Sequence, residues 1–142
     1  MPRFLLALFC ALPLLFGSCH HSTETPEPDG PLEGEWQVGL TDIVMYDAQD
    51  KVVATYPPNP DVVGYNQLII TTTELEYRRS TSTIRYAVPY THTGDQLICQ
   101  PPERSYTIRK LTAHQLDLYL RGEYLQVGAN QFRTDFVVHL QR

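Results

Sequence analysis

The cysteine thiols are the side chains of this 142-residue chain that most readily do chemistry, and there are three of them. A thiol becomes a nucleophile as the thiolate, which needs a basic and partly exposed setting. Cys99 instead ends a short aliphatic run, so we expect it to be a small buried side chain. Cys10 lies within a long apolar run, and Cys19 follows two small residues.

The other acid–base residues show no spacing typical of a catalytic or metal site. Glu74 and Glu76 lie two residues apart, which places both carboxylates on the outer face of one strand. Three histidines are scattered along the second half of the chain: His92, His114 and His139. The sequence therefore predicts no catalytic residue, no metal site and no cofactor, and we expect a protein that is not an enzyme.

Residues 1–18 have the organisation of a secretory signal. Arg3 gives a positive start, and the thirteen residues Phe4–Phe16 carry no charge. Gly17 and Ser18 are small enough to fit a peptidase active site just before the cut. The apolar run is too short to span a hydrocarbon core of about 30 Å, so we expect export and cleavage rather than a membrane-spanning helix.

The stretch Gly17-Ser18-Cys19 resembles the lipobox of bacterial lipoproteins, although Phe16 stands where leucine is usual. The resemblance implies that the Cys19 thiol receives a diacylglyceryl group and that Cys19 becomes the first residue of the mature chain. Each buried methylene of such an anchor contributes about 0.8 kcal/mol. We therefore expect a lipid-anchored protein of the cell envelope, in the outer membrane. Ordinary secretion with an incidental cysteine is the alternative.

The composition of the mature chain limits its partners. Removal of residues 1–18 takes away Arg3, so the remaining 124 residues carry 10 Lys and Arg against 16 Asp and Glu, a net charge of −6. An acidic domain is a poor partner for nucleic acid, whose phosphates require a basic face. With Cys19 acylated, Cys99 is the remaining thiol and no intrachain disulfide can form. The folded part must therefore be held by its apolar core.

Three segments follow from these patterns: a signal peptide over 1–18, a lipidated cysteine with a tether over 19–31, and a β domain over 32–142. The tether is rich in Pro, Glu, Ser and Thr and cannot bury enough apolar surface to fold. A proline-rich spacer of this kind extends by about 3.1 Å per residue.

Residues 32–142 read as eight to ten short strands with no helix, because apolar side chains alternate along them. Leu116–Leu120 alternates most cleanly, and residues 43–46 and 51–56 can pair as a hairpin. Trp36, Val38 and Leu40 are expected to share one face. The spacing of the turns predicts an all-β domain built as a small antiparallel up-and-down β-barrel. A β-sandwich is the alternative, since both folds alternate with period two.

The opening Gly34-x-Trp36, with Tyr106–Thr112 and Leu116–Leu118 near the end, resembles the lipocalin-like lipoproteins of Gram-negative envelopes. In that family the first-strand tryptophan packs across one end of the barrel, often under a basic residue from a late strand. The resemblance implies this place for Trp36, with Arg133 or Arg121 over its ring. A second interpretation is that Trp36 is a large core residue that needs no ligand.

Two functions follow for such a domain. An envelope-anchored barrel could bind a small apolar or amphipathic ligand. At 111 residues the domain is short, so its interior could instead be filled, leaving the outer face to bind another envelope protein or to inhibit an enzyme. The expected partners are the membrane, through acylated Cys19, and a small lipophilic ligand or an envelope protein. The residues expected to line the cavity or fill the core are Trp36, Val38, Tyr77, Tyr86, Tyr106, Leu118 and Phe136.

Overall fold

The computed structural model describes residues 30–79, 85–101 and 104–142. The signal segment, Cys19 and the tether as far as residue 29 lie outside this part of the chain, so what we expect of them stays a prediction. The described residues form strands and connecting turns without a helix. No helix in these ranges has the length and apolar character needed to cross a membrane.

The strands of the described chain are β1 (Gly34–Asp47), β2 (Val52–Tyr56), β3 (Gln67–Ile70), β4 (Glu74–Arg78), β5 (Arg85–Thr93), β6 (Gln96–Cys99), β7 (Arg104–Leu111), β8 (Gln115–Leu120), β9 (Tyr124–Val127) and β10 (Asn130–Gln141).

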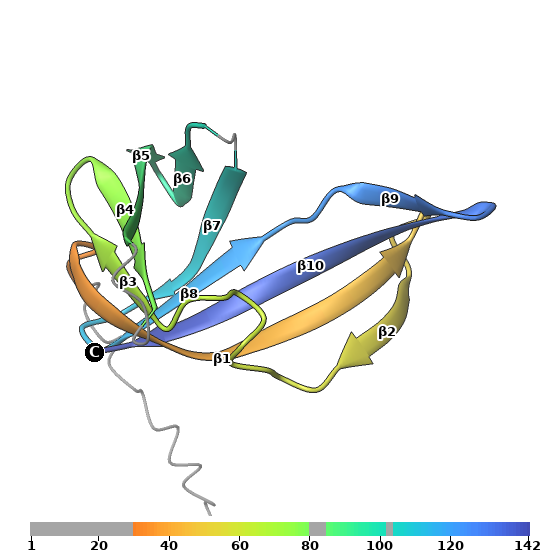
Figure 1. Ribbon diagram of the computed structural model, residues 1–142, viewed down its shortest axis with the longest axis horizontal. Coiled ribbons are helices and arrows are strands. Elements are labelled where there is room, and N and C mark those ends of the chain that lie inside the picture. The colour runs from red at the N-terminus through yellow and green to blue at the C-terminus, as the bar shows by residue number, and fades with distance from the viewer. Residues whose placement is uncertain (1–29, 80–84, 102–103) are drawn as a thin grey trace, which may run out of the picture.

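Eight of these strands form a closed antiparallel barrel (Figure 1). The order around it is β1-β3-β4-β5-β6-β7-β8-β10, and the pairing of β10 with β1 closes the ring. Neighbouring strands of the barrel also follow one another in the sequence, except that β2 and β9 are skipped because they lie outside the barrel. The predicted up-and-down barrel is therefore confirmed. The sandwich alternative is wrong, because one continuous sheet closes on itself.

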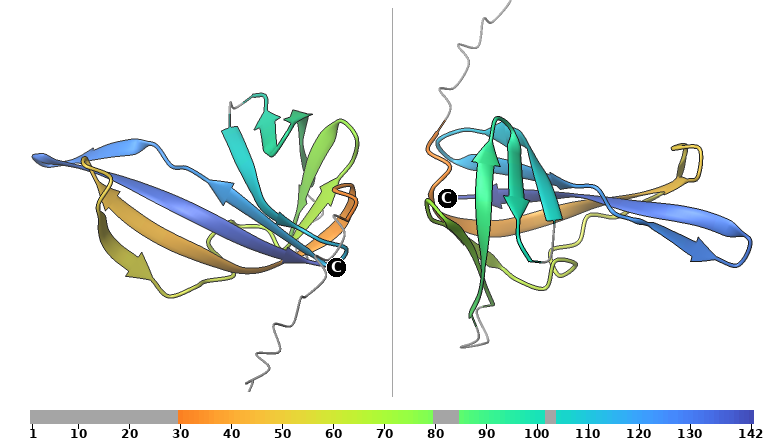
Figure 2. Two further views of the ribbon diagram at one scale, coloured as in Figure 1. Left: turned by 180° about the vertical axis from the view of Figure 1, so that it is seen from behind. Right: turned by 90° about the horizontal axis from the view of Figure 1, so that it is seen from above.

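Two strands, β1 and β10, are long enough to belong both to the barrel and to a second sheet beside it (Figures 1 and 2). β1 and β10 pair along most of their length, and their far halves continue beyond the barrel. There β2 pairs with β1 and β9 pairs with β10, which makes a four-stranded sheet in the order β2-β1-β10-β9. We call this sheet the wing. The hairpin expected from residues 43–46 and 51–56 is confirmed as its β1–β2 pair.

A bulge in β1 changes which side chains face inward. The register with β10 shifts between Val38 and Thr41. Because side chains alternate with period two, this shift moves the inward set by one position. Thr41 is fully buried, whereas Leu40 is 52% exposed. The expectation that Leu40 shares the buried face of Trp36 was therefore wrong.

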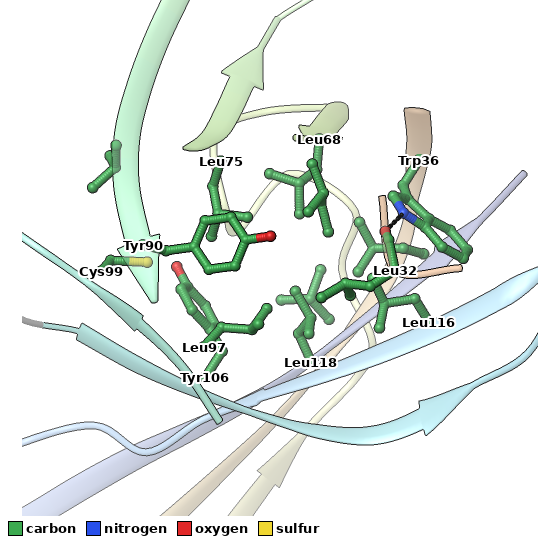
Figure 3. Packing of buried hydrophobic residues seen from close by; sticks show 14 residues of the cluster. Leu32, Trp36, Leu68, Leu75, Tyr90, Leu97, Cys99, Tyr106, Leu116 and Leu118 are labelled. Atoms are coloured by element: carbon green, nitrogen blue, oxygen red, sulfur yellow. Dashed lines mark hydrogen bonds between the residues drawn. The ribbon is translucent and has the colours of Figure 1, made fainter. Parts of the chain in front are cut away.

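The barrel interior is packed with aliphatic and aromatic side chains from every barrel strand (Figure 3). The alternation predicted in β8 is confirmed, since Leu116 and Leu118 are almost completely buried. Complete burial of a leucine contributes roughly 1.5–3 kcal/mol, so this cluster is a main source of stabilisation for the described residues, whose one cysteine, Cys99, is a free thiol. In Figure 3, Trp36 and Leu32 lie on one side of the cluster, and Cys99 and Tyr106 lie on the other.

Trp36 closes one end of the barrel. Its side chain has no exposed surface, and its indole N–H donates a hydrogen bond of 2.9 Å to the Leu32 carbonyl. The guanidinium carbon of Arg142 lies 4.0 Å from the centre of the indole ring. Arg142 also donates to three backbone carbonyl oxygens, those of Pro31, Glu33 and Ala113. We call this arrangement the floor.

The basic residue over Trp36 is thus Arg142 and not Arg133 or Arg121. The reason lies in the antiparallel pairing of β10 with β1, which places Gln141 beside Gln37. Arg142 is next along the chain and reaches the indole. Arg133 lies at the opposite end of β10, in the wing.

Candidate functional site

A cavity of about 460 Å³ lies at the end of the barrel opposite the floor. Its walls come from the ends of β4 and β6, the starts of β5 and β7, and the segment before β3. In an up-and-down barrel these positions share one rim, while the β7–β8 turn lies at the other. The volume falls in the usual range for small-molecule sites, about 300–1,000 Å³. Its lining residues are Val63, Gly64, Tyr65, Tyr77, Arg78, Arg79, Tyr86, Val88, Cys99, Arg104 and Tyr106.

Four tyrosines give the cavity a wall that is apolar on its ring faces and polar at its hydroxyls. The rings of Tyr65 and Tyr77 meet edge to face at 4.8 Å, and the Tyr86 ring lies 6.0 Å from that of Tyr77. The Tyr77 hydroxyl donates to the Tyr106 hydroxyl at 3.4 Å. Burial raises the pKa of Tyr65 and of Tyr77, so these hydroxyls stay protonated. Such a wall suits an uncharged, largely apolar body.

Cys99 belongs to this wall and is 2% exposed, which confirms that it is buried. Burial raises the pKa of the thiol, and the neighbouring Tyr77 hydroxyl and the charge of Arg104 offset this only in part. A thiol whose pKa is raised carries little thiolate at neutral pH. The site therefore presents Cys99 as a small apolar contact.

Three arginines stand among the lining residues. Arg78 ends β4, Arg79 follows it, and Arg104 begins β7. Arg79 and Arg104 are exposed, so they mark where the cavity opens to solvent. The Nε of Arg79 donates to the Gly64 carbonyl at 2.9 Å. Gly64 has φ of +71°, a conformation that suits glycine and lets the segment turn in beside the arginine.

The seven residues expected in the interior divide into three groups. Three line the cavity: Tyr77, Tyr86 and Tyr106. Three pack in or against the core: Trp36, Val38 and Leu118. Phe136 is half-buried and belongs to neither, because it sits where β10 leaves the barrel for the wing. The interior is thus filled at the floor and hollow at the opposite end.

Sequence reasoning missed several cavity residues, notably Tyr65, Val88 and the three arginines. Val88 carried a usable signal, since it lies two positions from Tyr86 on the same strand face. The arginines come from the ends of two strands that are not neighbours in the barrel, so only the closed fold brings them to one rim.

The wing contains a second cluster, built around a buried ion pair. Arg133 and Asp135 are 5% and 3% exposed, and the Arg133 Nε lies 2.8 Å from a carboxylate oxygen of Asp135. Arg133 also donates to Asp50, while the Tyr119 hydroxyl donates to Asp135 at 2.6 Å. The hydrogen bond to Asp135 raises the pKa of Arg133, and burial raises that of Tyr119 to about 12. Arg121 also lies 3.8 Å from Asp50, so two cations balance two carboxylates and the cluster holds strands together.

His139 bridges three strands on the outside of the barrel. Its two ring nitrogens lie 2.8 Å from Asp117 on β8 and 3.1 Å from Asp42 on β1. Burial lowers the pKa of His139, but the hydrogen bonds and charges of the two carboxylates outweigh this and raise it above 6.5. The described residues contain no group of three or more His, Cys, Asp or Glu side chains placed to hold a metal ion.

No protein-family model, curated protein or solved structure matches this chain. The closed barrel and its cavity are therefore the features from which its function is inferred.

Proposed function

We propose that this protein is a lipocalin-like lipoprotein of the Gram-negative envelope, without catalytic activity, whose barrel binds a small apolar or amphipathic ligand. The cavity lined by four tyrosines is the observation that carries the proposal. Cavities of this size with a mainly apolar and aromatic wall are typical of ligand sites. The lipobox-like stretch ending at Cys19 supports the anchor and a place in the outer membrane.

The packing of the interior limits the size of the ligand. Trp36, Leu116 and Leu118 fill the half of the barrel nearest the floor, and all three are almost fully buried. The ligand therefore occupies one half of the barrel and does not pass through it. A single alkyl chain or one ring system fits this shape better than a multi-chain lipid.

Native mass spectrometry of the gently purified protein tests ligand binding. A discrete added mass that is lost on unfolding is expected, and its value identifies the ligand class. Tyr86→Ala should weaken retention several-fold, because Tyr86 forms one wall and its 54% exposure makes the fold tolerant of its removal. Tyr56→Ala is the matched control, since Tyr56 is an exposed tyrosine of β2 outside the cavity. If the spectrum shows only the mass of the protein itself, even after incubation with lipid and sugar mixtures, ligand binding is refuted.

The anchor has its own test. Cys19→Ala should release the protein from the membrane fraction after a salt wash, because the acylated thiol would be lost. Cys10→Ala is the matched control and should leave retention unchanged, since that residue lies in the segment removed at export. Retention of the Cys19→Ala form would show that something else holds the protein.

A second candidate function, binding to another envelope protein, is favoured by the wing. Its outer strands expose aliphatic side chains, with Val53 46%, Leu125 67% and Val127 61% exposed. Exposed apolar side chains gathered on one structure mark interaction surfaces. Leu125→Lys should abolish co-purification of a stoichiometric partner from detergent extracts, while Leu40→Lys, on the exposed outside of the barrel, should preserve it. Equal recovery of the partner with both variants would exclude the wing as the binding surface.

A further inference from the structure

The cavity lining is positively charged, whereas the chain as a whole has a negative net charge. The whole chain has 16 acidic and 11 basic residues besides histidine. Among the residues that the structure describes, the cavity lining has three arginines and no aspartate, glutamate or lysine. A cationic rim on an acidic protein draws anionic ligands toward that opening rather than toward the surface as a whole.

Two of the three guanidinium groups have no acidic partner among the described residues. Arg78 is already paired, since its Nε lies 2.8 Å from the Glu76 carboxylate. Arg79 donates to the carbonyl of Gly64, which is neutral and leaves the charge unbalanced. Within the described ranges, the side chain of Arg104 has neither an ion pair nor a hydrogen-bond partner, although its backbone pairs with Cys99 of β6. Free guanidinium groups bind carboxylate and phosphate oxygens through paired N–H donors.

The charge of Arg104 acts on side chains that form the inner wall of the cavity. Burial raises the pKa of Tyr65 and of Cys99, but in both cases the Arg104 charge acts in the opposite direction. The guanidinium group therefore lies close to side chains that form the cavity wall. An anion beside Arg104 would sit at the mouth with the tyrosine-lined space directly behind it.

We propose that the ligand is a single-tailed amphiphile with an anionic headgroup, its tail among the tyrosines and its carboxylate or phosphate held by Arg79 and Arg104. This rests on the proposed function, because it needs an occupied cavity. The polarity of the cavity matches that of an amphiphile. Val63, Val88 and the tyrosine rings form an apolar wall that suits the tail, and the arginines at the mouth suit an anionic headgroup. Fatty acids and single-chain phosphate esters share this chemistry.

Four probes with the same twelve-carbon chain separate the contributions of head and tail: dodecanoate, dodecyl phosphate, dodecanol and dodecyltrimethylammonium. Each is titrated below its micelle-forming concentration against the purified protein by calorimetry. Both anions should bind at least about tenfold more tightly than the neutral and cationic probes, and added salt should weaken only the anions. The ratio between the two anions tells which headgroup is preferred.

Substitutions place the headgroup. Arg104→Gln should lower anion affinity about tenfold and leave dodecanol unchanged, and Arg104→Lys should restore part of the loss. Arg121→Gln is the control, since that arginine pairs with Asp50 in the wing. Equal binding of all four probes, or an unchanged affinity in Arg104→Gln, would overturn the anionic headgroup and leave ligand binding intact. Failure of every probe to bind would overturn both.

Discussion

Arg142 is the residue whose substitution tests the floor most directly. Its guanidinium group covers the Trp36 ring at 4.0 Å and donates at 2.7 Å to Ala113, 3.0 Å to Glu33 and 2.6 Å to Pro31. Arg142→Met removes all of these donors and keeps most of the side-chain stem, so packing changes little. Arg142→Lys keeps the charge but cannot reproduce a planar fork of donors.

The expected magnitude follows from these contacts. A cation over an aromatic ring at a partly exposed site contributes about 0.5–1 kcal/mol. Each carbonyl hydrogen bond contributes about 0.5 kcal/mol, the low end of the usual range, because the arginine is exposed and water competes for it. The free energy of unfolding should therefore fall by about 2 kcal/mol. With a urea m-value of about 1–2 kcal/mol per M, the midpoint should fall by roughly 1–2 M.

Urea unfolding followed by Trp36 fluorescence measures this change, because the chain has one tryptophan. Arg109→Met is the matched control: Arg109 stacks on the Tyr119 ring at 3.8 Å and lies on the exposed side of β7. It should lose only the contribution of its ring contact. If Arg142→Met and Arg109→Met lower the midpoint equally, the three carbonyl hydrogen bonds do not hold the floor and our reasoning is refuted.

Three further substitutions test other parts of the fold. Thr41→Val should leave the free energy of unfolding unchanged or raise it by up to about 1 kcal/mol, since the buried Thr41 hydroxyl has no hydrogen-bond partner among the described residues; a urea titration showing a clear loss would contradict this. Asp135→Asn should cost about 2 kcal/mol by leaving the buried charge of Arg133 poorly compensated, and a near-zero change in thermal unfolding would speak against that role. His139→Gln should destabilise the protein at about pH 5.5 and have little effect at about pH 9. The raised pKa of His139 gives stability that is present below about 6.5 and lost as pH rises through the folded value, so a difference that is flat with pH would exclude the ion pairs.

The strands were predictable because their burial alternates, and the exceptions have identifiable causes. The bulge between Val38 and Thr41 leaves no mark in the hydrophobic pattern, since Leu40 looks like the next inward residue. Residues 43–46 were expected as one strand of a short hairpin, but they belong with Trp36 and Val38 to the single strand β1, which continues from the barrel into the wing.

Local sequence patterns could not predict contacts between segments that lie far apart in the chain. Arg133 bonds to Asp50, which lies 83 positions away, and no periodicity in either segment indicates the pairing. Burial of Arg133 also contradicts the general preference of charged side chains for solvent, and only partners brought by the wing make it tolerable. The basic residue over Trp36 was expected from a resemblance, but its identity depends on the register of β10 with β1.

The floor also determines how the chain enters the domain. A Cβ atom on Gly30 would overlap the Thr112 carbonyl, and the Pro31 carbonyl accepts a hydrogen bond from Arg142, so the entering segment is packed on the side away from the cavity. If Cys19 carries the anchor, it lies eleven residues earlier, at most about 40 Å of extended chain. The anchor would then be attached on the floor side of the barrel, and the mouth of the cavity would lie on the side away from the point of attachment. A ligand could then reach that mouth from the aqueous compartment without passing the tether.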